Sequence, residues 1–325
     1  MPMQQTLGTF RAALVTGWIG LGAAGLLYAR LKSIPLWAAG PLIAAFLLEY
    51  SFYLVPGFAE VRDRLRGKLD RWQLAGALTV ASLAPYVVYS IPTGEFHWLA
   101  CAGLAAIAAV LAFWYVALRP SPAADLLFLA MVAAMVLSRV FRQIYTTPIQ
   151  AHLEILGQLM LIRTGALAAL DFRRVQGTRF GFIPSQKEWI TGVRYFFYFL
   201  PVGFPLALWL GVAKFNFTGF LFWKTLAIFC GALWVTALSE ELFFRGMLQN
   251  WLTGWTGRPY AALIAASLVF GAVHLPFRAF PNWRLAAVAA VSACFYGLAY
   301  QKAESIRASM VTHALVVTVW RTMFV

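Results

Sequence analysis

Long apolar runs separated by short polar loops recur along the whole chain. Ten of them approach the ~20 residues that a helix needs to cross ~30 Å of hydrocarbon. They lie near 12–28, 35–56, 74–91, 98–118, 125–141, 192–213, 219–252, 260–276, 284–300 and 306–324. Each run is therefore expected to form a membrane-spanning helix.

An eleventh segment, 151–170, is apolar but carries four polar or charged side chains: His152, Glu154, Gln158 and Arg163. Such a segment either crosses the bilayer or lies along its interface as an amphipathic helix. The pattern therefore predicts an all-α, polytopic membrane bundle with 10–11 transmembrane helices.

The composition agrees with this pattern. Hydrophobic residues make up 62% of the 325 positions and charged residues 12%, against roughly 45–50% and 25% in soluble domains. This balance excludes a water-soluble fold and makes the lipid bilayer the first expected partner.

The net charge of +14 does not indicate nucleic-acid binding, because the basic residues lie in short loops between apolar runs. Basic loops of this kind are typical of the cytoplasmic side of a membrane protein. Two such clusters occur, one at 62–71 and one at 173–187. Eleven spans with a cytoplasmic N-terminus place both clusters on that side, whereas Arg30 and Lys32 then face outward.

A polar, basic stretch rich in turn residues divides the chain in two. The expected organisation is an N-terminal transmembrane bundle of unknown role at 1–170, a basic cytoplasmic loop at 171–191 and a C-terminal core at 192–325. In the N-terminal part, Glu49 lies in an apolar run without an identifiable partner. It is interpreted as a packing residue or as a hydrogen-bond partner of a tyrosine.

The stretch SEELFFRG places three charges, Glu240, Glu241 and Arg245, inside one predicted span. An ionised side chain at mid-membrane costs at least ~2.5–3.5 kcal/mol, so such residues usually face a bundle interior or a wet cavity. Glu241 and Arg245 are four residues apart on a helix and can pair. Glu240 has no local partner, which leaves either a structural network between helices or a functional role.

Two histidines in the following spans favour a functional role. The turn at 252–260 contains two glycines and a proline, with Glu240 about 16 residues before its centre and His274 about 18 after it. At ~1.5 Å per residue, a helical hairpin brings these two to nearly the same level. His313, in the last span, can approach the same level from the cytoplasmic side.

A carboxylate beside an imidazole can deprotonate water. In this interpretation Glu240 is the general base, His274 holds and polarises the water, and His313 donates a hydrogen bond to the developing oxyanion. No cofactor is required for this chemistry. A divalent metal such as zinc remains the alternative, because two histidines and a glutamate are also a zinc ligand set, although the helix-borne HExxH arrangement is absent.

These motifs resemble those of a known family. EELFFRG at 240–246, FGAVH at 270–274 and the histidine at 313 are similar to the three motifs of the CAAX prenyl protease and bacteriocin-processing (CPBP) family of type II CAAX endopeptidase-like intramembrane proteases. The resemblance covers roughly 180–325 and includes GFIPSQKEW before the core. It implies that Glu240 and His274 activate the water, that Glu241 and Arg245 support them, and that His313 helps to form the oxyanion hole. It leaves metal dependence open.

One position departs from the family pattern. The last motif usually reads HxxxN, but Val317 occupies the position of the asparagine. Loss of one oxyanion donor costs on the order of 10²–10³ in rate, so a catalytically impaired or non-catalytic membrane scaffold is the alternative to a protease. Thr312 or Thr318 can replace the missing group only on an irregular helix. A proton-coupled transporter is a third interpretation, but neither inverted repeats nor broken helices are recognisable.

The expected protein is therefore a multi-pass endopeptidase of a bacterial cytoplasmic membrane. Its expected substrate is a membrane-associated peptide or protein, and nucleic acid is not an expected partner. The sequence does not identify the substrate or say whether it is prenylated.

Overall fold

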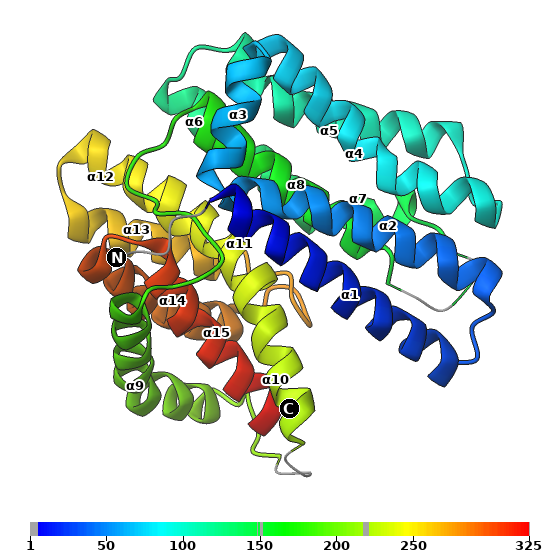
Figure 1. Ribbon diagram of the computed structural model, residues 1–325. Helices are drawn as coiled ribbons and strands as arrows, with labels where there is room; N and C mark the ends of the chain where they lie inside the picture. Colours follow the sequence, from blue (N-terminus) through cyan, green and yellow to red (C-terminus); the bar gives the residue numbers. More distant parts are fainter. Residues whose placement is uncertain (1–5, 148, 150–151, 217–220, 325) are drawn as a thin grey trace. The chain divides into compact units, whose positions relative to one another are not determined.

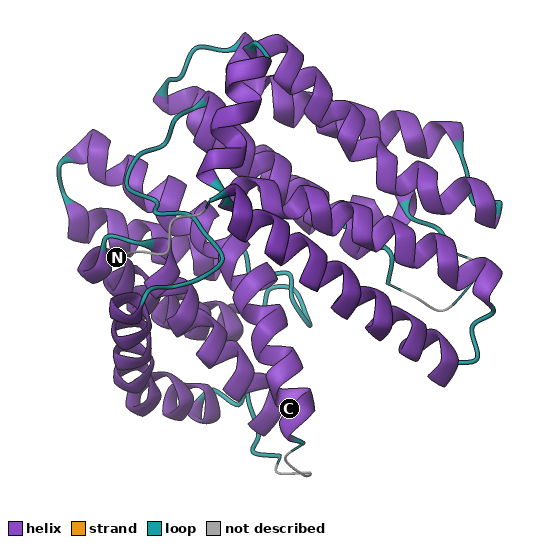
Figure 2. Ribbon diagram, in the orientation of Figure 1, coloured by secondary structure: helices purple, strands orange, loops and turns teal. Residues whose placement is uncertain are grey.

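The computed structural model describes residues 6–147, 149, 152–216 and 221–324. Within these ranges the chain is helical, with loops and a single isolated β-bridge between Phe215 and Phe324 but no strand (Figure 2). The predicted segments 151–170 and 219–252 each begin at residues that lie outside the described ranges. The remainder of both is helical, and the all-α fold class is confirmed.

Eight helices of the described chain are long and apolar enough to cross a membrane, by length and composition. This number of candidate spans is smaller than the ten or eleven that the sequence predicted. Two predicted segments form shorter apolar helices, Pro122–Leu137 and Pro259–Ala272. The last, Ile306–Met323, does not reach the hydropathy of a span because it carries Arg307, His313 and Arg321. The ambiguous segment becomes a candidate span, Glu154–Phe172.

The chain divides into two compact units, Met1–Arg174 and Val175–Val325. The described helices of the first unit (Figure 1) are α1 Leu7–Leu31, α2 Leu36–Leu54, η1 Val55–Gly57, α3 Ala59–Lys68, α4 Arg71–Thr93, α5 Trp98–Ala117, α6 Pro122–Leu137, α7 Val140–Ile144, α8 Glu154–Leu167 and η2 Ala168–Phe172. Within this unit, α4 packs against α2 and α5, and α8 contacts all three.

A buried ion pair joins α2 to α8 inside the first unit. Arg163 donates from Nε to Oε1 of Glu49 at 2.6 Å and from Nη2 to Oε2 at 3.3 Å, and both side chains are almost fully buried. Nη2 also reaches Oγ of Ser82 on α4 at 3.3 Å. Glu49 is thus buried within the N-terminal unit, and the sequence did not identify its arginine partner, which lies 114 positions away in the segment whose membrane crossing was left open.

The second unit is built from α9 Gln186–Trp209, α10 Phe222–Gly231, η3 Ala232–Ala237, α11 Leu238–Glu241, η4 Leu242–Gln249, α12 Asn250–Thr256, α13 Pro259–Ala272, α14 Trp283–Ala303 and α15 Ile306–Met323. The elements from α10 to α12 form one continuous 35-residue helix, Phe222–Thr256. It ends at Gly257, whose φ of 67° suits glycine, and α13 begins with Pro259 in its first turn. The predicted helical hairpin is thus formed.

One carboxylate links the starts of α9 and α15. Glu188 closes a capping box with Ser185 at the start of α9. Its Oε1 also accepts a hydrogen bond from Ser305, the N-cap residue of α15, and lies 2.9 Å from Nη2 of Arg307. Further along, Thr312 on α15 donates to the carbonyl of Gly192 at 2.9 Å. These contacts fix the position of α15 against α9.

Candidate active site

The paired glutamates lie on a helix that departs twice from α geometry. Glu240 and Glu241 belong to the short α-helical segment α11, which is flanked by the π-helical segments η3 and η4. A π-helical turn is wider than an α-helical turn, and such turns are frequent at functional sites. The sequence analysis assumed a regular α-helix here and did not predict these turns.

Glu241 is the centre of the polar cluster. It is fully buried, and three side chains converge on its carboxylate. Nε of Arg245 lies 3.2 Å from Oε2, the hydroxyl of Ser309 donates to Oε2, and Nδ1 of His313 lies 2.7 Å from Oε1. The predicted pair of Glu241 and Arg245 is therefore formed. Two residues of α15, Ser309 and His313, also contact the carboxylate of this pair.

Arg245 is fully buried and is held from several sides. Its Nη2 donates to the carbonyl oxygen of Ala293 on α14 at 2.6 Å. Its guanidinium carbon lies 5.1 Å from the ring centroid of Phe270 and 5.4 Å from that of Tyr296. Carboxylate, carbonyl and aromatic faces together compensate the charge, as a buried guanidinium requires.

His313 connects the two glutamates. Its Nδ1 contacts Glu241, and its Nε2 lies 3.8 Å from Oε2 of Glu240. The ring of Tyr296 stacks on the imidazole with centroids 4.4 Å apart. The His313 side chain is 4% exposed, whereas that of Glu240 is 33% exposed. Glu240 is thus the accessible member of the cluster, and Glu241 is the buried one.

His274 lies just beyond the last residue of α13 and is half-buried. Its Nδ1 is 2.7 Å from the carbonyl oxygen of Phe270, and its ring centroid lies 4.8 Å from that of Phe270. The same phenylalanine ring contacts His313, with centroids 5.8 Å apart. The two histidines therefore approach one aromatic ring from different helices.

Glu240 and His274 were expected at nearly the same level, on either side of a water molecule. Among the described residues, the imidazole within ion-pair distance of Glu240 is that of His313. The reason is that α15 approaches α11 directly, through the contacts of Ser309 and His313 with Glu241.

Sequence reasoning missed two contributors, Ser309 and Tyr296, and assigned no role to Phe270 of the FGAVH motif. Ser309 precedes His313 by four residues and so shares its face of α15, a signal that could have identified it. Phe270 precedes His274 by the same spacing. Tyr296 carries no comparable signal, because its role depends on how α14 packs against α15.

Neither threonine supplies the polar group missing at Val317. α15 is a regular α-helix, and Val317 is half-buried on it. The hydroxyl of Thr312 donates to backbone carbonyls of Gly192 and Ala308, and that of Thr318 donates to the carbonyl of Ala314 at 2.6 Å. Each hydroxyl therefore already donates its hydrogen to a backbone carbonyl and does not serve as an oxyanion donor.

A zinc ion requires three protein ligands converging on one point. In the described part of the chain, no group of three or more His, Cys, Asp or Glu side chains is arranged to hold a metal ion. Nδ1 of His313 is engaged by Glu241 and Nδ1 of His274 by the Phe270 carbonyl. Nε2 is therefore the nitrogen of each ring that is left to act on water or on a metal ion.

Comparison with known proteins supports the motif-based assignment. Residues 221–319 match the sequence model of the Rce1-like family, type II CAAX prenyl endopeptidases. No curated protein and no solved structure gives a significant match to the chain. The matched segment runs from the start of α10 into α15 and contains Glu240, Glu241, Arg245, His274 and His313. The predicted resemblance is thus confirmed, in that residues 221–319 of this multi-pass membrane chain are similar to the Rce1-like type II CAAX prenyl endopeptidase family.

Proposed function

We propose that this protein is an intramembrane endopeptidase in which Glu240 activates the water that attacks a peptide bond. The observation that carries the proposal is the position of His313 between the buried carboxylate of Glu241 and the accessible carboxylate of Glu240. An imidazole held in this way is oriented before substrate binds, so its free nitrogen faces the reacting atoms without further reorganisation.

The hydrogen-bond partners assign the proton on each imidazole. An ionised carboxylate only accepts, so Nδ1 of His313 carries the proton that it donates to Glu241. In the imidazolium form, its Nε2 also carries a proton on the side of Glu240. A carbonyl likewise only accepts, so Nδ1 of His274 carries a proton and its Nε2 presents a lone pair in the neutral form.

The proposed reaction needs no other groups. Nε2 of His274 accepts one hydrogen of the water, and Glu240 removes the other as the water oxygen bonds to the scissile carbonyl carbon. The carbonyl oxygen becomes an oxyanion, which accepts a hydrogen bond from Nε2–H of His313 in its imidazolium form. Glu240 then gives its proton to the amide nitrogen as the C–N bond breaks, leaving a carboxylic acid and an amine.

Glu241 and Arg245 are assigned a supporting role. The guanidinium offsets the charge of the buried carboxylate, and the carboxylate holds His313 in one tautomer and one orientation. Glu241 is too enclosed to act on water itself, since its two oxygens are occupied by Arg245, Ser309 and His313.

The proposed substrate is the tail of a membrane-associated peptide or protein, and the proposed location is a bacterial cytoplasmic membrane. A panel of tail peptides, prenylated and unprenylated, incubated with the purified protein in detergent tests the proposal. We expect Glu240→Gln and His274→Ala to abolish cleavage. Equal turnover by the wild type and both variants would exclude it.

The same assay tests the metal alternative. We propose that cleavage proceeds without a divalent metal, so treatment with a chelator should leave the rate unchanged. Loss of cleavage on chelation, with recovery on adding Zn²⁺, would instead indicate that binding of substrate or metal assembles a site from these residues.

A second function is favoured by Val317. A chain that lacks the polar group at this position can bind a membrane peptide without hydrolysing it. In this case the peptide binds with equal affinity to the wild type and to Glu240→Gln, and no product forms with either.

A further inference from the structure

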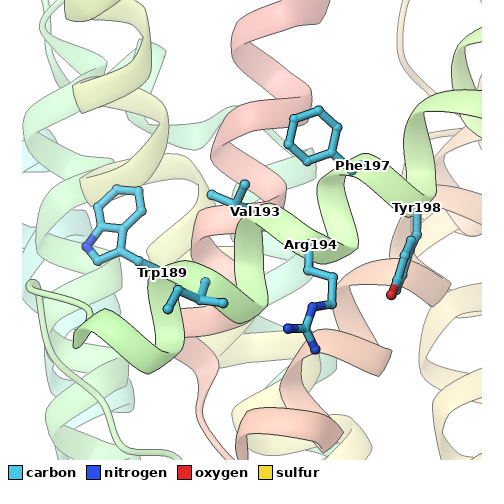
Figure 3. Close-up of a pocket in the computed structure, with 6 residues that line it drawn as sticks. Trp189, Val193, Arg194, Phe197 and Tyr198 are labelled. Carbon is cyan, nitrogen blue, oxygen red and sulfur yellow. The ribbon is translucent and has the colours of Figure 1, made fainter.

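A surface hollow of about 470 Å³ lies along one face of α9, away from the residues of the candidate active site. It is lined by Trp189, Ile190, Val193, Arg194, Phe197 and Tyr198. Figure 3 shows the aromatic side chains and the arginine extending from successive turns of the same helix. The hollow is therefore apolar along its length with one cationic group in it.

Arg194 is exposed and forms no hydrogen bond or ion pair with any residue that the structure describes. The acid nearest to it along α9 is Glu188. Its carboxylate already pairs with Arg307 and accepts hydrogen bonds from the N-cap residues of α9 and α15. The positive charge of Arg194 is thus not compensated within the described chain, in contrast to Arg163 and Arg245.

The depth of Arg194 makes this lack of a partner costly. α9 is a candidate membrane span of 24 residues, which is ~36 Å long at ~1.5 Å per residue. Arg194 lies eight residues after Gln186, or ~12 Å along the helix, in a span that must cover ~30 Å of hydrocarbon. A guanidinium at this level needs an anion, or must extend toward the headgroups along an apolar surface.

We propose that this hollow binds one anionic phospholipid, with its phosphate on Arg194. A guanidinium can donate two parallel hydrogen bonds to a phosphate, and basic pockets on membrane helices bind lipid headgroups. One acyl chain lies along Val193, Phe197 and Tyr198, and the ring of Trp189, nearer the start of the helix, flanks the interfacial part, where tryptophan is enriched.

The hollow favours a lipid over free phosphate because five of its six lining residues are apolar or aromatic. It favours an anionic over a zwitterionic lipid because no acid lines it to pair with a choline or ethanolamine group.

Native mass spectrometry of the purified full chain in neutral detergent tests the proposal. The probes are phosphatidylglycerol, phosphatidylcholine and diacylglycerol with identical acyl chains, and inorganic phosphate. We expect the wild type to bind phosphatidylglycerol roughly tenfold more tightly than phosphatidylcholine, the scale of a charge-assisted contact. Diacylglycerol should bind more weakly still, and inorganic phosphate should not displace the lipid.

The variants separate this site from general charge attraction. Arg194→Gln should remove the preference for phosphatidylglycerol, and Arg194→Lys should retain part of it. Arg284→Gln, which removes an exposed cation from α14 of the same unit, is the matched control and should keep the full preference. An unchanged preference in Arg194→Gln would overturn the proposal, as would an equal loss in Arg284→Gln. Thermal unfolding of each variant checks that it is folded.

Discussion

Nδ1 of His313 lies 2.7 Å from Oε1 of Glu241, although the two residues are 72 positions apart in the sequence. This contact joins α15 to α11 and places the second imidazole nitrogen beside Glu240. The buried glutamate of the pair thus orients a histidine toward the accessible one, so two adjacent acids of the same chemical type have different roles.

Removing the charge of Glu241 should destabilise the second unit. Glu241→Gln leaves the buried guanidinium of Arg245 without its carboxylate, and breaking a buried pair in this way costs about 3–5 kcal/mol. Ser309→Ala removes one hydrogen bond to the same carboxylate and should cost about 1.5–3 kcal/mol. Unfolding by SDS titration in mixed micelles measures both. A Glu241→Gln variant as stable as Ser309→Ala would contradict the central role of this pair.

Restoring a polar group at position 317 should increase cleavage. Val317 lies four residues after His313 and shares its face of α15, so Val317→Asn is expected to raise kcat, by up to the ~10² attributed to one oxyanion donor, with little change in KM. Val317→Ala changes the volume without adding a donor and should not raise kcat. If the two substitutions have the same effect, Val317 does not limit the reaction. Any gained activity must disappear when Glu240→Gln is added.

The close contact of α9 with α15 should depend on Gly192. A Cβ at this position would lie 2.5 Å from Cβ of Val311 and 2.7 Å from the carbonyl oxygen of Ala308. Gly192→Ala therefore forces the helices apart, and overpacking of this kind costs about 1–3 kcal/mol. In contrast, a Cβ at Gly254 on α12 meets nothing within 4 Å. Gly254→Ala should be neutral or stabilising by up to ~1 kcal/mol in the same SDS titration.

The ion pair of Glu49 and Arg163 should show strong coupling in a double-mutant cycle. Glu49→Leu or Arg163→Met alone leaves one partner uncompensated and should cost about 3–5 kcal/mol, whereas the two substitutions combined remove both groups and should recover most of the loss. Limited proteolysis and thermal unfolding in detergent measure the stability of the first unit. Additive losses in the double variant would show that the two side chains do not act as a pair.

The sequence by itself determined the all-α membrane fold, because the length and hydropathy of each apolar run depend only on local residues. It also marked Glu240, Glu241 and Arg245 as candidate site residues, since charges are rare in such runs and their presence needs a reason. The Glu241–Arg245 pair was also predictable, because residues four positions apart on a helix share one face.

Only the tertiary structure decided which residues of different helices meet. Glu49 pairs with an arginine 114 positions away, and His313 lies within ion-pair distance of Glu240. Helical periodicity gives the level and face of a residue on its own helix. The rotation and approach of neighbouring helices come from contacts such as Gly192 against Val311 and Ser309 against Glu241, which exist only once the helices pack.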